Sequence, residues 1–427
     1  MTAIVVGGGL AGLVAGYRLA KAGRRVTVME ATTRLGGMIH PVEVGGVRVD
    51  AGAEAYAIRG GAARALCEEL GLELAAPAGQ PHLWWPRGTW PMAEGVLGIP
   101  ASLDDPALGA LDPDELETLT RDGELPASVG ADASTVGELV RARLGDGAVR
   151  RLVAPVAHGV YALDPDRMPL NAFAPGLLAA LAEHGSLLAA VASMRHPGRA
   201  AVEQPVGGMY TLIDTLAERI VDLGGEVRTA SPIVAVAHAG PDFVVGLPGG
   251  EKLRADRLVL ATPGAAAVSL LGRLAVDVAA PPIKKARQAV LAVEHPGLAD
   301  GPVGSGLLVG ESDPSIGAKA LTHYSLKWPW ARRGDQEIFR LSYPENHVPS
   351  RTDVMADASR FLGVELRDAQ ITGFAAVTWD AMPGRLDAPV REFVLDTVAK
   401  AGIDVVGAWL DGNGITAVVA GCDRVTG

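Results

Sequence analysis

The sequence predicts an α/β fold with a Rossmann-like dinucleotide-binding domain at its start. Three observations in the first 37 residues support this prediction. An apolar run at 4–6 leads into a glycine-rich turn, a helical pattern of apolar residues then reaches Lys21, and a second apolar run from Val26 to Met29 ends on Glu30. A strand, a glycine turn, a helix and a second strand in this order are typical of a dinucleotide site.

Each glycine of the turn has its own predicted role. Gly7 permits the tight turn, Gly9 lets the backbone approach a pyrophosphate, and Gly12 lets the helix pack close to the strand. We expect the phosphates on the backbone N–H groups at the positive end of the helix. Glu30 ends the second strand, where its carboxylate can accept both ribose hydroxyls of an adenosine.

The segment after Glu30 indicates which dinucleotide to expect. Arg34, Gly36 and Gly37 form an RxGG run that adds a second backbone turn and a guanidinium near the pyrophosphate. A flavin enzyme reduced by a nicotinamide cofactor normally carries a second strand, GxGxxG and helix in mid-chain, and the sequence has none. One bound FAD is therefore predicted, with electrons arriving with the substrate and leaving to a small acceptor.

Composition favours a globular protein and argues against a nucleic-acid-binding one. A chain of 427 residues with 48% hydrophobic content predicts two domains or one large discontinuous domain. The net charge of -11 argues against a nucleic-acid surface. The nearest approach to a basic cluster, Lys284, Lys285 and Arg287, is expected to be a solvated face of a helix or strand. The two cysteines, Cys67 and Cys422, have no metal or redox spacing, so no metal site is expected.

No membrane insertion is predicted. The apolar run from Leu258 to Leu271 is too short to span a bilayer and contains Pro263 and Gly264. Because Met1 leads straight into the first strand, we expect no signal peptide and a cytoplasmic location. The oligomeric state is left open.

The first half of the chain continues with mixed elements. An extended segment from Val47 to Tyr56 turns at Gly52, and a helix follows over 64–70. The segment with Trp84 and Trp85 predicts a strand pair, which either lines a cavity or forms a core hairpin. The pattern from 112 to 192 is helical, with breaks expected at Pro126, Pro155 and Pro175.

The second half returns to the nucleotide domain. A helix is expected over 209–223, followed by short strands at 226–228, 233–237 and 243–247 and an apolar parallel strand at 257–261. A strand-rich region at 284–341, a helix at 353–362, a strand at 404–407, a glycine turn at 412–414 and a helix from Ile415 complete the chain. The predicted domains are a discontinuous FAD-binding domain (1–80, 200–275 and 375–427), a substrate-binding domain (81–101 and 276–374) and a helical insert (102–199).

Motifs along most of the chain resemble the FAD-dependent protoporphyrinogen and coproporphyrinogen oxidases of the amine oxidase superfamily. They include VVGGGLAGL, RLGG, VDAGAEAY at 49–56, LWWPRGTWPM, LVAPVAHGVYALDPDRM at 152–168, ADRLVLATP and the closing GAWLDGNGITAVVAG. The stretch from Leu139 to Asp166 looks particular to the porphyrinogen oxidases. The resemblance implies a Rossmann-like FAD-binding domain of the amine-oxidase type, a mixed-sheet substrate domain and an inserted helical subdomain.

The resemblance also implies roles for individual residues. The RxGG and GxGxxG residues with Glu30 would bind the ADP half of FAD, and Ile233 would hold the adenine through its backbone. Five residues would lie along the flavin: Gly52, Ala53, Trp409, Gly414 and Ile415. Glu54 and Tyr161 are placed nearest the macrocycle, with a surface acid and a core tyrosine as the alternatives. No catalytic side chain is assigned, because the flavin itself carries the chemistry.

The activity implied is that of an oxygen-dependent oxidase of haem synthesis that acts on a porphyrinogen and releases hydrogen peroxide. Coproporphyrinogen III is preferred over protoporphyrinogen IX, because soluble bacterial relatives of this kind tend to make coproporphyrin III. Two alternatives stay open: another flavoenzyme of the same superfamily, and a non-catalytic flavin- or porphyrin-binding protein.

Overall fold

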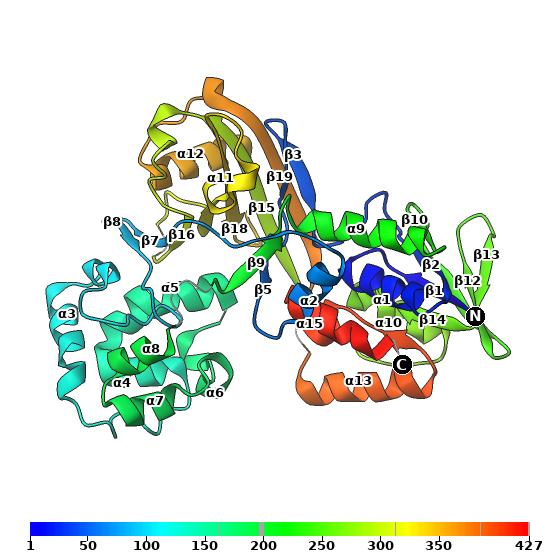
Figure 1. Ribbon diagram of the computed structural model, residues 1–427, viewed down its shortest axis with the longest axis horizontal. Coiled ribbons are helices and arrows are strands. Elements are labelled where there is room, and N and C mark those ends of the chain that lie inside the picture. Colours follow the sequence, from blue (N-terminus) through cyan, green and yellow to red (C-terminus); the bar gives the residue numbers. More distant parts are fainter. Residues whose placement is uncertain (162, 196–199, 312, 385, 426–427) are drawn as a thin grey trace. The chain divides into compact units, whose positions relative to one another are not determined.

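The structure, a computed structural model, describes residues 1–161, 163–195, 200–311, 313–384 and 386–425 (Figure 1). The chain divides into two compact units. The first comprises Met1–Pro77, Ala200–Gln288 and Val377–Gly427, and the second comprises Ala78–Arg199 and Ala289–Ala376. The end of the expected helical insert, at 199, lies outside the described residues, and the assignment of three domains stays a prediction.

A five-stranded parallel sheet forms the centre of the first unit (Figure 1). Its strand order is β10-β2-β1-β14-β20, and every adjacent pair is parallel. The strands are β1 (Thr2–Val6), β2 (Arg25–Met29), β10 (Glu226–Arg228), β14 (Arg257–Leu260) and β20 (Asp404–Val405). The order reverses between β1 and β14, because β2 and β10 lie on one side of β1 while β14 and β20 lie on the other. Sheets of this kind bind ligands outside the carboxyl ends of the strands at such a reversal.

Both faces of this sheet are covered, which explains the apolar runs in the sequence. Val5 of β1 packs into one core cluster, whereas Ile4 and Val6 pack into the other. Strands that are buried on both faces favour apolar residues at nearly every position, and within these runs the partly buried Thr27 of β2 is the exception. The predicted strands at 4–6 and 26–29 are confirmed on this basis.

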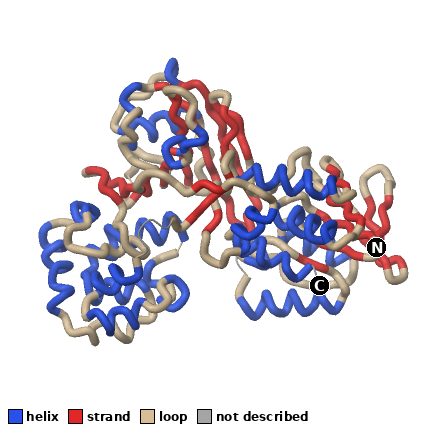
Figure 2. Tube along the Cα trace, viewed as in Figure 1, coloured by secondary structure: helices blue, strands red, loops and turns tan. Residues whose placement is uncertain are grey.

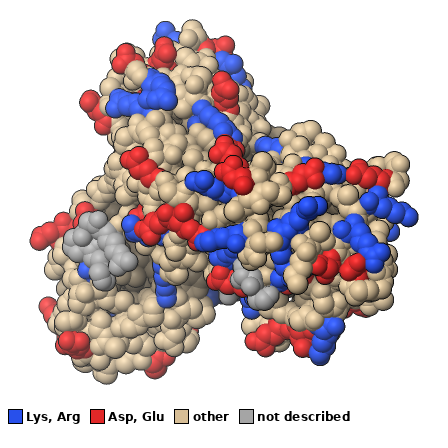
Figure 3. All heavy atoms as spheres, turned by 45° about the vertical axis from the view of Figure 1, so that its right-hand side comes forward, with Lys and Arg blue, Asp and Glu red and all other residues tan. Residues whose placement is uncertain are grey.

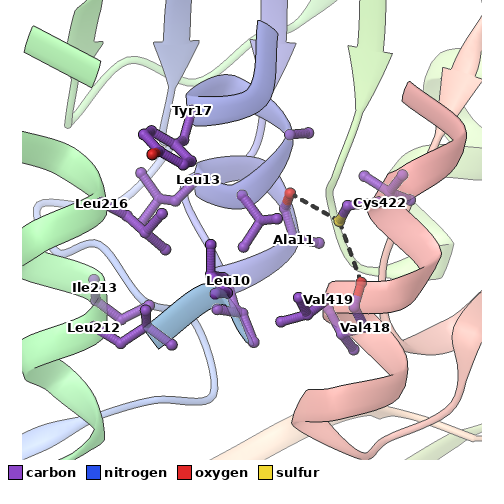
Figure 4. Close-up of a cluster of buried hydrophobic side chains, with 14 of the residues drawn as sticks. Leu10, Ala11, Leu13, Tyr17, Leu212, Ile213, Leu216, Val418, Val419 and Cys422 are labelled. Atoms are coloured by element: carbon purple, nitrogen blue, oxygen red, sulfur yellow. Dashed lines mark hydrogen bonds between the residues drawn. The ribbon is translucent and has the colours of Figure 1, made fainter. Parts of the chain in front are cut away.

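The helix after the glycine turn is the centre of the first core cluster. Figure 4 shows α1 (Leu10–Lys21) between α9 (Met209–Asp222) and α15 (Ile415–Gly421). The Cys422 thiol donates a hydrogen bond to the carbonyl oxygen of Ala11 in α1, with the sulfur 3.4 Å from the oxygen. Three segments that are far apart in sequence therefore share one core. The remaining helices of the unit are α2 (Ala62–Glu69), α10 (Gly264–Arg273), α13 (Ala388–Lys400) and α14 (Ala408–Asp411).

Smaller antiparallel layers complete the first unit. One sheet has the strand order β11-β12-β13 and another has the order β5-β9-β6, and β3 pairs with β4. The strands are β3 (Pro41–Val44), β4 (Val47–Asp50), β5 (Tyr56–Ala57), β6 (Leu74–Ala75), β9 (Val202–Pro205), β11 (Ala235–Ala239), β12 (Asp242–Gly246) and β13 (Lys252–Ala255). The antiparallel layer expected between 233 and 247 is present, but its first strand begins at Ala235, two residues later than predicted.

A seven-stranded mixed sheet has the order β19-β15-β18-β17-β16-β7-β8. Its strands are β7 (Pro81–Trp85), β8 (Gly88–Pro91), β15 (Ile283–Glu294), β16 (Gly306–Val309), β17 (Ala320–His323), β18 (Gln336–Tyr343) and β19 (Ile371–Pro383), with α11 (Tyr324–Lys327) and α12 (Arg351–Leu362) among its connections. The strand pair expected around Trp84 is β7 and β8. The ring of Trp84 is buried and meets Phe361 edge to face at 5.6 Å, which favours the core hairpin over the cavity lining.

Helices make up most of the described segments 113–161 and 163–194 (Figure 2). The α-helices are α3 (Pro113–Thr120), α4 (Val136–Ala148), α5 (Ala154–Val156), α6 (Leu170–Phe173), α7 (Leu177–His184) and α8 (Leu187–Met194). The break expected at Pro155 is wrong: the chain stays helical through it, with π-helical turns at Val149–Val153 and Ala157–Tyr161 on either side. The wider π turn makes room for a proline ring that would otherwise clash with the preceding turn.

The basic residues near 284 also differ from expectation. Lys284 and Lys285 are exposed on β15, but Arg287 is only 7% exposed and donates to the carbonyl oxygen of Trp379 and to the carboxylate of Asp380. Its side chain is therefore packed within the unit instead of solvated. On the face drawn in Figure 3, basic and acidic side chains are interspersed.

Within the described residues, no single helix has both the length and the apolar composition that a membrane crossing requires, and α7 and α8 meet the criterion only as a pair bent by 119°.

Candidate functional site

The candidate site lies at the carboxyl edge of the parallel sheet and begins with the glycine turn between β1 and α1. Gly7 has a φ of 111°, and a Cβ there would lie 2.6 Å from the Ala261 carbonyl oxygen. A Cβ on Gly12 would overlap the Gly7 carbonyl oxygen, whereas one on Gly9 would meet nothing nearer than the Cα of Gly37 at 3.9 Å. Packing therefore requires glycine at 7 and 12, and Gly9 leaves open space beside the turn.

The start of α1 supplies hydrogen-bond donors to that space. Gly9 is the N-cap residue and carries no side chain that accepts from the first turn. The first N–H groups of a helix have no acceptor within the helix, and they carry the positive end of its dipole. The turn therefore fits a phosphate group of a dinucleotide.

Glu30 lies at the end of β2, next to the same turn. One carboxylate oxygen, Oε2, accepts the Gly8 N–H at 2.8 Å, and the other, Oε1, accepts the N–H and the hydroxyl of Thr32, each at 2.8 Å. A carboxylate has about four acceptor positions, so these bonds orient the group without exhausting it. Its placement fits the ribose role predicted from sequence.

Arg34 is engaged by the backbone of its own loop. Its guanidinium donates to the carbonyl oxygens of Leu35 at 2.8 Å, Ile39 at 3.0 Å and Gly37 at 2.9 Å. Burial lowers the pKa of the Arg34 guanidinium, and the neighbouring Glu30 carboxylate acts in the opposite direction. Arg34 thus folds the RxGG loop, and its contact with pyrophosphate stays a prediction.

The RxGG loop packs directly against the first turn. The Gly36 N–H donates to the Gly8 carbonyl oxygen at 2.9 Å. The loop also leads to the segment expected along the flavin, because the Ala53 N–H donates to the Met38 carbonyl oxygen at 3.1 Å and a Cβ on Gly52 would overlap that oxygen. The structure thus brings the two glycine motifs and the Gly52 segment together.

The segment before β11 runs beside Glu30. The Ser231 N–H donates to the Glu30 carbonyl oxygen at 2.8 Å, and the Ala230 N–H donates to that of Thr32 at 2.6 Å. Ile233 follows these residues and packs its side chain against a core cluster. Its backbone contact with adenine stays a prediction, although the adjoining residues lie next to the proposed ribose carboxylate.

The segment after β20 forms a further part of the edge. The Trp409 indole is 1% exposed, and its N–H has no hydrogen-bond partner among the described residues. No atom lies within 4 Å of a Cβ built on Gly412 or Gly414, and Ile415 starts the following helix. The glycines therefore leave room for a flat ligand beside this loop.

Sequence reasoning missed Thr262. It follows β14, the strand on the other side of the reversal from β2, and its backbone nitrogen would lie 3.1 Å from a Cβ on Gly7. Its buried hydroxyl has no partner among the described residues. A buried hydroxyl without a partner is costly, so Thr262 is a further candidate for the cofactor site. Its position directly after an apolar strand was the available signal.

The two predicted substrate residues belong to different units. Glu54 is half-buried next to Ala53 in the first unit. Tyr161 lies in the second unit at the end of a π turn, is 42% exposed, and meets the Phe173 ring edge to face at 5.3 Å. Its exposure contradicts the alternative of a core tyrosine, and both substrate roles stay predictions.

Comparison with known proteins gives three findings. A family model described as flavin containing amine oxidoreductase matches residues 10–291. The curated coproporphyrinogen III oxidase of Mycobacterium tuberculosis is 32% identical, with 98% of this chain and 95% of that protein aligned, and that of Bacillus subtilis is 26% identical, with 79% and 76% aligned. A crystal structure from Exiguobacterium sp., assigned to protoporphyrinogen oxidase, has a TM-score of 0.81 at 23% identity and covers 100% of this chain and 97% of its own.

Proposed function

Because the chain belongs to the family of flavin-containing amine oxidoreductases, we propose that it is an oxygen-dependent FAD oxidase that converts coproporphyrinogen III to coproporphyrin III. The predicted α/β class with a Rossmann-like flavin-binding domain is confirmed by this family and by the fold of its structural relatives. One observation carries the proposed substrate. Similarity to a curated coproporphyrinogen III oxidase extends over 98% of the chain, well beyond the segments that bind a cofactor.

The residues at the sheet edge fit FAD. The N–H groups at the start of α1 would hold a pyrophosphate, the Glu30 carboxylate would accept ribose hydroxyls, and the open space at Gly414 would receive the flavin end. Bound FAD supplies the acceptor for the hydrogens removed from the porphyrinogen, and each pair of hydrogens finally reduces one oxygen molecule to hydrogen peroxide. The protein binds and orients the reactants, and the proposal requires no side-chain acid or base.

The decisive experiment follows flavin and porphyrin together. The purified chain should show a bound-flavin spectrum, and in air it should produce fluorescent porphyrin and hydrogen peroxide from coproporphyrinogen III. Faster turnover of protoporphyrinogen IX would move the substrate assignment to that compound. Flavin bleaching without a fluorescent product would contradict the oxidase, and absence of bound flavin from a folded protein would contradict the cofactor.

We place the reaction in the cytoplasm. Cys67 and Cys422 are both free and buried in the first unit, and free thiols are the rule in a reducing compartment. Fractionation of cells that produce the chain should recover it with cytoplasmic markers. Recovery with the membrane pellet after a high-salt wash would contradict this location.

A further inference from the structure

The carboxylate of Asp411 is the centre of an ionic cluster next to the closing glycine loop. Its side chain is 2% exposed. Asp411 Oδ1 lies 3.4 Å from Arg391 Nη2 and 2.7 Å from Arg424 Nη1, and Oδ2 lies 3.1 Å from Arg424 Nη2. Oδ2 also accepts the Gly407 N–H at 3.2 Å, so both oxygens have partners.

The two arginines also bind the backbone around the loop. Arg391, on α13, donates through Nε to the Leu410 carbonyl oxygen at 2.5 Å. Arg424, which follows α15, donates to the carbonyl oxygen of Val405 in β20 at 3.4 Å. The cluster thus ties β20 and α14 to α13, which precedes them in the chain, and to the segment after α15.

Gly421 provides the space that the carboxylate occupies. A Cβ on Gly421 would overlap the Asp411 carboxylate, and the three atoms nearest to that Cβ all belong to Asp411. Because Gly421 has no side chain, the Asp411 carboxylate can be buried against α15.

The loop that this cluster holds needs external support. Gly407 and Gly412 have φ values of 133° and 95°, which are accessible to glycine and rare for other residues. Glycine also has the largest conformational entropy to lose, so a loop of this kind does not hold one shape by itself. The side facing Asp411 is packed, while Gly412 and Gly414 have no neighbour within 4 Å of an added Cβ.

We propose that Asp411 is a positioning residue that fixes the 407–414 loop in the conformation that binds the flavin end of the cofactor. It acts through Arg391, Arg424 and the Gly407 N–H, and it does not itself touch the cofactor. The proposal rests on the proposed function, because it takes the ligand of this edge to be FAD. Without the carboxylate the loop samples other conformations, and the apparent affinity falls in proportion to the fraction of molecules that remain competent.

The first test compares two matched variants. Asp411→Asn keeps the shape and removes the charge, and Asp396→Asn removes an exposed acid of α13 that pairs with Lys400. If about a tenth of the Asp411→Asn molecules keep the competent loop, the Kd for FAD rises about tenfold. The visible absorption of the bound flavin should also lose resolved structure, while Asp396→Asn behaves as wild type. FAD titration of the apoprotein measures both properties.

Unfolding temperatures separate positioning from a purely structural role. A positioning role reduces the difference in Tm between the FAD-bound and FAD-free protein, because that difference follows cofactor affinity. A structural role lowers both temperatures equally and leaves the Kd and the flavin spectrum unchanged, and this result would overturn the proposal.

A second variant, Gly421→Ala on α15, disturbs the Asp411 carboxylate without changing Asp411 itself. Gly421→Ala displaces Asp411 while keeping both arginines, so it should weaken FAD binding in the wild-type background and have little further effect in Asp411→Ala. An equal effect in both backgrounds would contradict the proposed route through Asp411. A folded wild-type chain without FAD affinity contradicts the proposed function and this proposal together, whereas equally tight binding by wild type and Asp411→Asn contradicts this proposal alone.

Discussion

Two carboxylates at the sheet edge are held in place by hydrogen bonds within the protein itself. Glu30 accepts from Gly8 and Thr32 on one side of the sheet reversal, and Asp411 accepts from Gly407 on the other. In each case backbone N–H groups fix the position of an anion or of a loop. The site is therefore oriented by hydrogen bonds within the protein.

Glu30→Ala should weaken FAD retention. A hydrogen bond to a charged group contributes about 1.5–3 kcal/mol, so the Kd should rise by about 10- to 100-fold. Fluorescence titration with FAD measures this change, and Asp222→Ala, which removes an exposed acid of α9, is the control. Because Glu30 also holds Gly8, urea unfolding of the apoprotein should be measured in parallel. Unchanged retention would refute the ribose role.

Because the thiols of Cys67 and Cys422 are buried, we expect the free energy of unfolding to fall at high pH. Burial raises the pKa of Cys422 to about 12 and that of Cys67 to about 11, from a value of 9.0 in the unfolded chain. Above about pH 9 the unfolded chain loses these protons while the folded chain keeps them, so the free energy of unfolding falls by about 1.4 kcal/mol per pH unit for each thiol.

Urea unfolding of wild type and Cys422→Ala at about pH 8 and about pH 10 tests this dependence. The variant is less stable throughout because it creates a cavity, but its stability should fall less steeply with pH. Parallel curves for the two proteins would show that the Cys422 thiol does not account for the loss.

The sequence indicated which residues meet at the sheet edge better than it indicated their contacts there. The glycines at 7, 9 and 12 were predictable because backbone geometry restricts such positions to glycine. Arg34 was expected near a phosphate, and that contact stays a prediction. The structure adds three hydrogen bonds from its guanidinium to the carbonyl oxygens of Leu35, Gly37 and Ile39, which no local pattern predicts. Thr262 escaped notice because its importance comes from a strand neighbour more than 250 residues away in the sequence.

At the scale of elements, two glycines of the strand–turn–helix unit have different roles. Gly12 is needed for folding, whereas Gly9 is expected to be needed for binding the cofactor. Gly12→Ala places a Cβ onto the Gly7 carbonyl oxygen, and such overpacking costs about 1–3 kcal/mol or more. Gly9→Ala meets only the Cα of Gly37 at 3.9 Å, and its φ of -74° suits alanine. Gly9→Ala should therefore fold as wild type but bind no FAD, because its methyl group occupies the space beside the turn.

Thermal unfolding and the flavin spectrum of the two variants check this contrast. Gly12→Ala should unfold at a clearly lower temperature than Gly9→Ala when both are free of cofactor. FAD binding by Gly9→Ala with wild-type affinity would show that the phosphates do not approach the backbone at this glycine.

Elements with a strong local pattern were predictable, and those fixed by distant partners were not. The helices α9 and α12 were expected within two residues of their observed bounds, and α1 ends at Lys21 as expected, because their apolar spacing is regular. β19 was not expected: its sequence, ITGFAAVTWDAMP, does not alternate cleanly, and its partner β15 lies about 80 residues earlier. At Pro155 the sequence predicted a helix break where the structure has none, because local propensity does not indicate the π turns on either side.

At the scale of the molecule, the proposed cofactor site belongs to a unit made of three separate stretches of chain. The helix α1 packs between α9 and α15, and these come from different stretches (Figure 4). Stabilisation of α1 by a ligand should therefore spread to both neighbours. FAD should slow amide hydrogen exchange at 10–21, 209–222 and 415–421 together, as expected for one cooperative unit. Protection confined to the glycine turn would contradict this coupling.

The split origin of the parallel sheet has a consequence for biosynthesis. β1 and β2 emerge from the ribosome early, but β20, which completes their sheet, is made some 375 residues after β2. At about 5–20 residues per second, the newly made glycine turn waits roughly 20–75 s for the last strand of its sheet. Flavin capture must then be a late event, after translation has passed Val405, and a chain interrupted before that point should be recognised by its lack of colour.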